Sequence, residues 1–383
     1  MRISPKLTQL GSYPFVQLDQ AKDRMRARGV PLIDFGVGDP REETPAFIRR
    51  ALAGAITPRS SYPRAIGLPE LREAIAAWVA GRFGVPLDPA TEIIPTLGSK
   101  EVIFSLAQVV IDPGGGKDLV LTTTPAYDVP RRGALMAGAE VAELPLQERN
   151  GFLPDLDAVT DATWQRAALV WVNYPNNPTA AVAPLGFYQR LAELARRHDY
   201  LLASDEAYSE LWYDQPPASA LQVADRSNVV AVNTLSKRSC MTGYRSGFVA
   251  GDPRLVRALA TYRPSTGVTP QEFVQRASIA AWGDEAHVET LRHRYAAKRR
   301  VLLDVLDAQG LRTVGSAATF YLWVAAPDGE TSLGFAQRLL EDGGIIVTPG
   351  SFLGAAGEGY VRVALVPTLE ECERAATLLA KLL

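Results

Sequence analysis

The fold of this chain is decided by one stretch in which a strand, a helix and a second strand follow one another. It runs from Ala168 to Asp205 and reads ALVWVNYPNNPTAAVAPLGFYQRLAELARRHDYLLASD. Ala168–Val172 and Leu201–Ala203 are apolar on successive residues, a pattern typical of strands that are covered on both faces. Between them, Leu185–Arg197 carries apolar residues at helical spacing. This order predicts a mostly parallel sheet with right-handed crossovers, and therefore an α/β protein.

The same alternation of apolar runs and helical patterns extends on both sides of this stretch and changes near Gly283. Leu119–Leu121 and Val229–Val232 are two further apolar runs of the same kind. After Gly283 we expect helices and strands in the order Glu285–Ala308, Phe320–Val324, Ser332–Glu341, Val361–Leu365 and Leu369–Leu382. We therefore predict a large domain over residues 41–283 and a smaller α+β domain formed by residues 1–40 and 284–383.

Composition restricts the function classes that this chain can serve. Of its 383 residues, 47% are hydrophobic and 21% charged, and a net charge of -2 offers no basic field to nucleic acid or to a membrane surface. No apolar run approaches the roughly 20 residues of a membrane span, and the N-terminus lacks the apolar core of a signal peptide. Cys240 and Cys372 are far apart and the three histidines form no ligand cluster, so we expect no disulfide framework and no metal site. A cytoplasmic protein without nucleic-acid or membrane partners is the expectation.

Polar side chains collect at the ends of the predicted strands. Asn173–Asn177 follow the first strand of the quoted stretch, Asp205 ends the second, and Thr234–Lys237 follow a third. Gly98–Glu101 opens another predicted helix. Alone, each has an ordinary explanation, because lysine is usually a solvated charge, aspartate a helix cap and Asn-Pro a turn. Because ligands of open α/β sheets gather at the carboxyl ends of strands, their coincidence predicts one site.

Short motifs occur in a fixed order around these strand ends, and they are Asn176-Asn177-Pro178-Thr179, Ser204-Asp205-Glu206-Ala207-Tyr208, Thr234-Leu235-Ser236-Lys237 and Gly243-Tyr244-Arg245-Ser246-Gly247. Together with Ile33–Pro40 and Val361–Ala364, they resemble the class I and II pyridoxal-phosphate-dependent aminotransferases of fold type I, over nearly the whole chain. The resemblance implies a transaminase whose large domain holds a mostly parallel sheet of the seven-stranded type between helices. Ala180 departs from the pattern, because most relatives carry glycine there, so this loop is expected to differ slightly.

The resemblance gives roles to the residues around the cofactor ring. Lys237 would hold pyridoxal 5'-phosphate as a Schiff base, since among side chains only lysine supplies such an amine, and the freed amine would move the substrate proton. Asp205 would keep the ring nitrogen protonated. Tyr208 and Asn177 would hydrogen-bond the phenolic oxygen of the cofactor, and Tyr127 would stack on the ring face.

The resemblance also implies a phosphate site and a second subunit. Ser99 and Lys100 begin a predicted helix, where backbone N–H groups would point at an anion. The phosphate site would be completed by Thr234, Ser236 and Arg245. Tyr62 resembles the tyrosine that reaches the phosphate of a neighbouring subunit, which implies a homodimer with shared active sites.

For the substrate, the resemblance assigns Arg362 to the α-carboxylate, because a planar guanidinium suits a planar anion. Gly38 and Asn177 would lie beside the same carboxylate, and Tyr13 would cover the substrate. Segments such as Leu235–Asp252 resemble the N-succinyldiaminopimelate aminotransferase group most closely. That resemblance implies transfer between glutamate or 2-oxoglutarate and N-succinyl-LL-2,6-diaminopimelate, in lysine biosynthesis. A cation for the distal carboxylate would come from Arg131, Arg132 or Arg263, and the sequence does not choose among them.

Other activities share these residues. Aspartate, LL-diaminopimelate and other amino acid aminotransferases have the same core, and a carbon–sulfur β-lyase uses the same lysine, aspartate and tyrosine. A lyase would release pyruvate and ammonia without any keto-acid acceptor. A cofactor-binding regulator would need a DNA-binding module, for which residues 1–34 are too short. A protein that has lost the cofactor would not keep Lys237, Asp205 and Arg362 together.

Overall fold

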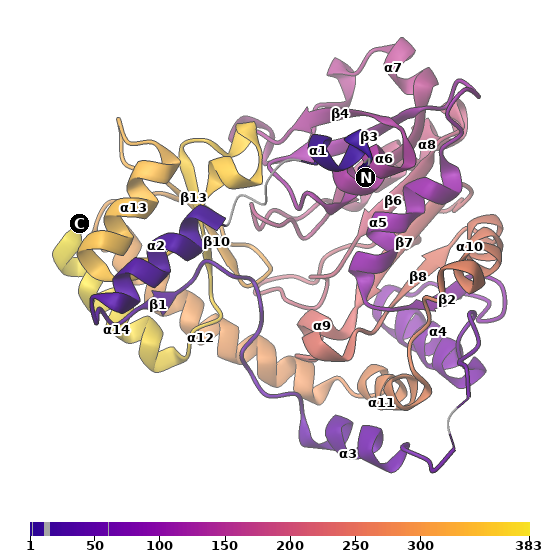
Figure 1. Cartoon of the computed structure of the whole chain (residues 1–383), viewed down its shortest axis with the longest axis horizontal. Coiled ribbons are helices and arrows are strands. Elements are labelled where there is room, and N and C mark those ends of the chain that lie inside the picture. Colours follow the sequence, from indigo (N-terminus) through magenta and orange to yellow (C-terminus); the bar gives the residue numbers. More distant parts are fainter. Residues whose placement is uncertain (2, 11–15, 60) are drawn as a thin grey trace.

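The structure, a computed structural model, describes residues 1, 3–10, 16–59 and 61–383. A seven-stranded sheet with the order β2-β8-β7-β6-β5-β3-β4 forms the centre of the larger part of the molecule (Figure 1). Its strands are β2 (Ile93–Thr96), β3 (Leu119–Thr124), β4 (Glu140–Pro145), β5 (Ala167–Asn173), β6 (Leu201–Asp205), β7 (Val229–Thr234) and β8 (Gly247–Gly251). β3, β4, β5, β6 and β7 run parallel to one another, whereas β8 is antiparallel to both β2 and β7. The predicted fold class, with a mostly parallel sheet, is confirmed.

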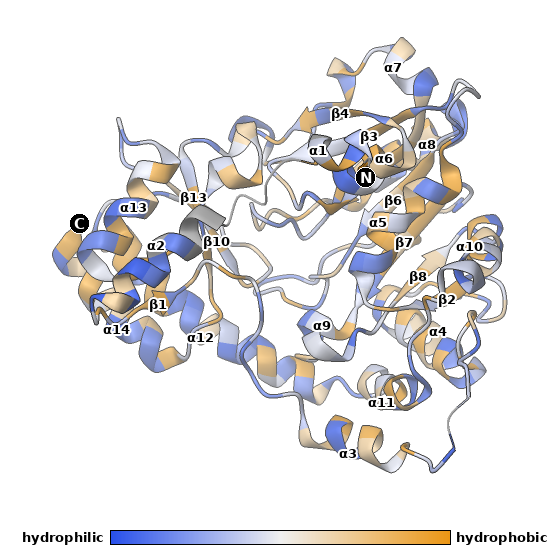
Figure 2. Cartoon of the chain, viewed as in Figure 1, coloured by the Kyte–Doolittle hydropathy of each residue, from blue (hydrophilic) through white to orange (hydrophobic). Residues whose placement is uncertain are grey.

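Apolar residues at successive positions of the central strands reach two different cores. In β5, Leu169 and Trp171 pack on one face, whereas Val170 and Val172 pack on the other. Since side chains alternate across a strand, a strand covered on both faces needs apolar residues throughout. Figure 2 shows the result as largely hydrophobic strands under helices that mix hydrophobic and hydrophilic residues.

Helices cover both faces of this sheet. One face carries α5 (Ser99–Val110), α6 (Val129–Ala137) and α10 (Pro253–Thr266). The other carries α4 (Pro69–Phe83), α7 (Asp161–Arg166), α8 (Leu185–His198) and α11 (Glu272–Trp282), with α3 (Ala46–Gly54) packed on α11. The short α9 (Leu235–Arg238) begins directly at the end of β7. α8 confirms the helix predicted inside the quoted stretch.

A four-stranded sheet with the order β12-β13-β10-β9 forms a second, smaller part of the molecule. Its strands are β9 (Thr313–Gly315), β10 (Tyr321–Ala325), β12 (Thr348–Pro349) and β13 (Tyr360–Ala364). β10 and β13 share a core with α12 (Ala286–Ala308), α13 (Ser332–Gly343) and α14 (Leu369–Leu382). The elements predicted after Gly283 are therefore confirmed, with small shifts at their ends. Within the described ranges of the chain, no helix combines the length and the hydropathy that crossing a membrane requires.

The N-terminal residues contact both sheet-containing parts. α1 (Pro5–Gln9) lies on α6, where Lys6 Nζ donates to the carbonyl of Met136 at 3.0 Å. By contrast, α2 (Val16–Ala27) packs with its Met25 against Leu340 of α13, and β1 (Ile33–Asp34) pairs in parallel with β11 (Ile345–Ile346), all in the smaller part of the molecule (Figure 1). An ion pair between the buried Lys22 and the half-buried Asp34, at 3.0 Å, joins α2 to β1. The domain boundaries near residues 40 and 283 stay a prediction.

Candidate active site

The carboxyl ends of β5, β6 and β7 bring the predicted residues together at one edge of the large sheet. Asn173 ends β5, and its Nδ2 donates to the carbonyl of Asp205, at the end of β6, over 2.9 Å. Thr234 ends β7 and is the N-cap of α9, which contains Lys237. Neighbouring parallel strands end at the same edge, so residues far apart in the sequence meet here.

The amine of Lys237 lies between this edge and the start of β10. Its Nζ donates to the carbonyl of Gly38 at 2.8 Å and lies 5.9 Å from the ring centroid of Tyr208 and 5.5 Å from that of Phe320. Burial lowers the pKa of Lys237 to about 8, and the carboxylate of Asp39 opposes this shift. A lowered pKa leaves more of the amine unprotonated near neutral pH, as a nucleophile for a carbonyl group must be.

Asp205 offers a buried carboxylate at the same edge. The residue is 7% exposed, and one carboxylate oxygen accepts the N–H of Ala207 at 3.1 Å. Burial raises the pKa of Asp205 to about 6, whereas the Ala207 N–H and the amine of Lys237 favour its charged form. A cationic N–H placed against this carboxylate would bring its pKa back towards the normal value. The protonated nitrogen of a pyridine ring is such a group.

Arg362, on β13, reaches this place from the smaller sheet. Its Nη1 donates to Asn177 Oδ1 at 2.8 Å, and its Nη2 donates to the carbonyl of Gly36 at 2.9 Å. Its Nε is buried and has no hydrogen-bond partner among the described residues. A buried donor without a partner costs about 1–3 kcal/mol. A carboxylate ligand would satisfy this donor, so the geometry fits the predicted role of Arg362.

The start of α5 forms a candidate anion site with Arg245. Gly98 is the N-cap of this helix with a φ of 72°, and a Cβ at Gly98 would lie 2.4 Å from Nη2 of Arg245. The guanidinium therefore lies against the first turn of α5, where free N–H groups and the helix dipole also favour an anion. Arg245 Nη1 donates to the carbonyl of Thr242 at 2.8 Å, which fixes its position. Ser99, the first residue of α5, is at this turn.

The other residues predicted to bind the phosphate differ in whether their donor groups are already used inside the protein. The Thr234 hydroxyl accepts the Ser236 N–H and lies 2.9 Å from the carbonyl of Ser246 and 3.0 Å from Ser236 Oγ. The Thr234 hydroxyl has one proton, and acceptors inside the protein already take it, so Thr234 serves as the cap of α9. In the bond between the two hydroxyls Thr234 is the donor, so the hydroxyl proton of Ser236 stays available to a phosphate. Lys100 is exposed, and its Nζ lies 5.7 Å from the ring centroid of the half-buried Tyr127.

Two predicted residues are not brought to this site by the described chain. Tyr62 is fully exposed, with a relative accessibility of 102%, which leaves its side chain available to a second subunit. Tyr13 lies outside the described residues. In the loop after β5, Ala180 has a φ of 56°, the left-handed region that favours glycine, which explains why glycine is the expected residue there.

The three arginines considered for a distal carboxylate have different surroundings. Arg263 is fully buried, forms an ion pair with Glu101 at 3.4 Å and donates to the carbonyl of Pro95 at 2.6 Å. Its guanidinium is therefore committed to the interior, and Arg263 was a wrong candidate. Arg131 and Arg132 both pair with Asp128, the residue after Tyr127, and stay candidates.

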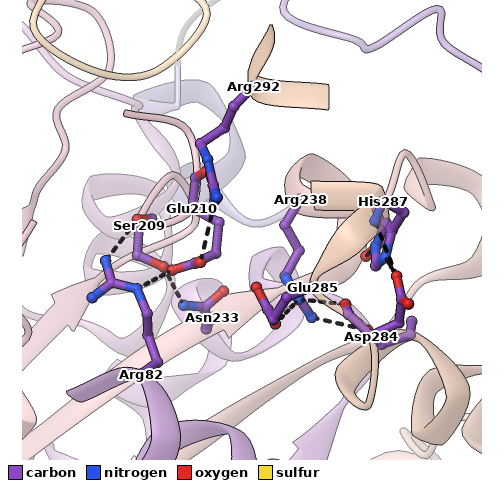
Figure 3. Close-up of polar contacts among 11 residues, drawn as sticks. Arg82, Ser209, Glu210, Asn233, Arg238, Asp284, Glu285, His287 and Arg292 are labelled. Atoms are coloured by element: carbon purple, nitrogen blue, oxygen red, sulfur yellow. Dashed lines mark hydrogen bonds and ion pairs between the residues drawn. The ribbon is translucent and has the colours of Figure 1, made fainter. Parts of the chain in front are cut away.

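A polar network holds α9 from the side of α12 (Figure 3). Arg238 is 1% exposed, and its Cζ lies 5.3 Å from the ring centroid of Trp78 and 4.7 Å from that of Trp282. It also forms an ion pair with Glu285. On the other side of Figure 3, Glu210 pairs with Arg82 at 2.9 Å, which anchors the segment after Tyr208.

Next to this network, a serine, a histidine and an aspartate are in contact in the order known from hydrolases. Ser239 Oγ is 2.9 Å from His287 Nε2, and His287 Nδ1 is 2.6 Å from Asp284 Oδ1. Ser239 is only 1% exposed, so no substrate reaches its hydroxyl. The contact fixes the C-terminal end of α9, and with it the helix that carries Lys237.

Two aromatic residues of this site were not predicted. Phe320 lies next to the amine of Lys237, and the hydroxyl of Tyr321 is 2.9 Å from that of Tyr208. The sequence indicated only a strand at these positions. The apolar pattern of that strand does not show which of its residues face the larger sheet. It therefore gave no signal that Phe320 and Tyr321 belong to the site.

Known proteins resemble this chain over its whole length. The family model for aminotransferase class I and II matches residues 30–379. An LL-diaminopimelate aminotransferase of Nitratidesulfovibrio vulgaris strain Hildenborough is 41% identical, and the match covers 100% of this chain and 99% of that protein. Another, of Aquifex aeolicus, is 41% identical over 97% of each chain. The solved structure of a probable N-succinyldiaminopimelate aminotransferase from Thermus thermophilus has a TM-score of 0.89 at 33% identity, covering 96% of this chain and 100% of that one.

Proposed function

This chain belongs to the class I and II aminotransferases and is a pyridoxal-phosphate-dependent transaminase, and from that premise we propose that it transfers an amino group from LL-diaminopimelate to 2-oxoglutarate. The main support for this substrate is the 41% identity, over the whole chain, to a protein named LL-diaminopimelate aminotransferase. The N-succinylated substrate expected from the sequence has weaker support, from a structure at 33% identity, and becomes the second candidate.

The residues at the sheet edge fit the chemistry of the cofactor. The cofactor supplies an electron sink that stabilises negative charge at the α-carbon of the substrate. Lys237 offers a largely buried amine with a lowered pKa for its attachment, and Asp205 offers a buried carboxylate for its ring nitrogen. The start of α5 and Arg245 offer donors and positive charge for its phosphate. Ser236 adds a hydroxyl, and the ring centroid of Tyr127 lies 5.7 Å from Nζ of Lys100, the second residue of α5.

The remaining side chains bind the substrate and move its proton. Arg362 would bind the α-carboxylate through the Nε that has no partner among the described residues. The freed amine of Lys237 would take the proton from the α-carbon and deliver it to the reacting carbon of the cofactor. Asn177, held through its Oδ1 by Arg362, keeps its Nδ2 as a donor for the phenolic oxygen, and Tyr208 supplies a second donor there. Gly38, whose carbonyl holds the Lys237 amine, borders the same space.

We extend the proposal to a homodimer in which Tyr62 completes the phosphate site of the partner. The support is that Tyr62 is fully exposed, and that Ile56, just after α3, and Phe273, on α11, are also exposed apolar side chains. α3 and α11 pack on each other, so these two residues belong to one region of the molecule. A tyrosine with a free hydroxyl and an apolar ring is suited to an interface of this kind. No nucleic acid or membrane partner enters the proposal.

A panel of amino donors tests the substrate. The purified protein is given pyridoxal phosphate, 2-oxoglutarate and one of three donors, LL-diaminopimelate, N-succinyl-LL-diaminopimelate or aspartate, and glutamate formation is followed. The proposal predicts the highest kcat/KM with LL-diaminopimelate. A higher value with the N-succinylated donor would transfer the assignment to the second candidate, and a higher value with aspartate would reject both.

The same assay separates a carbon–sulfur β-lyase from a transaminase acting on these donors. A lyase releases pyruvate and ammonia from a cysteine conjugate without any keto acid. The proposal predicts that no pyruvate or ammonia forms from a cysteine conjugate when 2-oxoglutarate is left out, and their release would favour the lyase.

A further inference from the structure

Tyr321 lies where the residues assigned to the substrate and to the cofactor meet. Its hydroxyl is 2.9 Å from the hydroxyl of Tyr208, and the two rings meet edge to face at a centroid distance of 5.5 Å. The Cζ of Arg362 lies 4.6 Å from the centroid of the Tyr321 ring. Tyr321 is 2% exposed and is therefore held by its surroundings on all sides.

Sheet geometry explains how Tyr321 supports Arg362. In the antiparallel pair β10–β13, Tyr321 is opposite Ala364 and Trp323 is opposite Arg362. Tyr321 and Arg362 are thus diagonal neighbours on one face, within reach of an aromatic ring and a long side chain. A guanidinium over a tyrosine ring is attracted by the electrons of the ring, and the attraction increases when water is excluded.

The backbone at Gly38 leaves room for the hydroxyl of Tyr321. A Cβ at Gly38 would lie 2.0 Å from the Tyr321 hydroxyl oxygen, so any larger residue at that position would displace it. The carbonyl of the same Gly38 accepts the Lys237 amine at 2.8 Å. Tyr321 is therefore packed against the segment that also holds the lysine.

The number of protons in the contact between the Tyr208 and Tyr321 hydroxyls indicates what this contact does. Each tyrosine hydroxyl has one proton, and one bond between two hydroxyls uses one proton of the pair. Burial raises the pKa of both Tyr208 and Tyr321, so both protons stay in place. Either hydroxyl is able to donate. An anionic oxygen on the far side of Tyr208 would select the arrangement in which Tyr321 donates to Tyr208.

We propose that Tyr321 is a positioning residue whose hydroxyl donates to Tyr208 and so directs the proton of Tyr208 to the phenolic oxygen of the cofactor. The inference rests on the proposed function. Hydrogen bonds in a chain polarise one another, so the Tyr321 hydroxyl strengthens the bond from Tyr208 to the cofactor. The charged or titratable groups facing this pair are Arg362, Asp205, Asp39 and Lys237. The ring of Tyr321 supports Arg362 separately from its hydroxyl.

The test is the pH dependence of the cofactor's absorbance in the loaded protein, without substrate. Donation to the phenolic oxygen favours the unprotonated linkage to Lys237, so weaker donation moves the midpoint of the absorbance change to higher pH. Tyr321→Phe should raise this midpoint by about half a pH unit. Tyr208→Phe should raise it further, because it removes the donor itself. The matched control is Tyr213→Phe, since the Tyr213 hydroxyl donates to the carbonyl of Thr319 at 2.7 Å and lacks the contact with Tyr208.

A midpoint in Tyr321→Phe equal to that of the wild type, while Tyr208→Phe is shifted, would overturn the inference and leave the proposed function intact. Wild-type protein that shows no cofactor absorbance would overturn both. A second readout separates the hydroxyl from the ring. Tyr321→Phe keeps the ring beneath Arg362, so KM for the amino donor should change less than about twofold, whereas Tyr321→Leu should raise it about fivefold. A tenfold rise in KM for Tyr321→Phe with an unshifted midpoint would also overturn the inference.

Discussion

Replacing Arg362 by lysine tests whether this residue binds substrate rather than merely joining the two parts of the fold. Arg362 presents a planar fork whose Nη1 and Nη2 donate to Asn177 Oδ1 at 2.8 Å and to the carbonyl of Gly36 at 2.9 Å. The Nε donor is buried without a partner among the described residues. Lysine keeps the positive charge but has neither the fork nor the flat face that stacks on Tyr321.

The expected rise in KM follows from the number of hydrogen bonds to the substrate carboxylate that the substitution removes. A hydrogen bond to a charged group contributes about 1.5–3 kcal/mol, and lysine keeps one of the two bonds that a bidentate fork makes with a carboxylate. Arg362→Lys should therefore raise KM for both the amino donor and 2-oxoglutarate about 10- to 100-fold. Of the residues assigned to the cofactor, Arg362 donates to Asn177 alone and to none at the phosphate, so the affinity for pyridoxal phosphate should change less than about threefold.

The assay is steady-state kinetics with each substrate varied, together with a titration of cofactor-free protein with pyridoxal phosphate. Arg299→Lys is the matched control, since Arg299 also stacks on a tyrosine, with its Cζ 4.7 Å from the ring centroid of Tyr213, but donates to the carbonyl of Ser316 at 2.9 Å. Equal losses of cofactor affinity and of substrate affinity in Arg362→Lys would show that Arg362 does not act on the substrate specifically. So would an unchanged KM.

Two further changes probe the surroundings of the site. Burial raises the pKa of Glu206 from 4.5 to about 7. Between these two pH values the folded protein holds a proton that the unfolded protein has lost. The free energy of unfolding therefore falls as the pH rises from 4.5 to about 7. Glu206→Gln should therefore stabilise the cofactor-free protein at pH 8 by an amount on the order of 2 kcal/mol and much less at pH 5, measured by urea unfolding; equal effects at the two pH values would contradict this. Gly98→Ala places a Cβ 2.4 Å from Arg245 Nη2 at a φ of 72°, so the affinity for pyridoxal phosphate should fall about tenfold in a titration. Gly81→Ala in α4, where a Cβ meets nothing within 4 Å, is the control and should leave this affinity unchanged.

The sequence predicts the centre of this fold because its strands are buried on both faces. β5, β6 and β7 appear as continuous apolar runs, and a helix of matching length separates the first two. The edge strands lack this signal. β2 contains Pro95, which is tolerated because this strand pairs with β8 alone, and β4 has a largely exposed burial pattern.

The candidate site was predictable where it sits on strand ends, whereas on the smaller sheet Arg362 came from the family resemblance and Tyr321 was missed. Asp205 and Lys237 directly follow apolar runs, so the rule that ligands gather at carboxyl ends of strands brings them together. Tyr321 faces Tyr208 across 113 positions of sequence, and the contact depends on how the smaller sheet packs against the larger. Arg263 was misjudged because a sequence pattern does not reveal that Glu101 and two backbone carbonyls surround its guanidinium.

Every role assigned at this site depends on Lys237 holding the cofactor. The most direct measurement is to load the protein with pyridoxal phosphate, reduce it with borohydride, digest it and locate the modified residue by mass spectrometry. We expect one modified site, at Lys237, and no cofactor absorbance of a lysine-linked kind in Lys237→Ala. Modification at another lysine, such as the exposed Lys100, or no modification after loading, would contradict it.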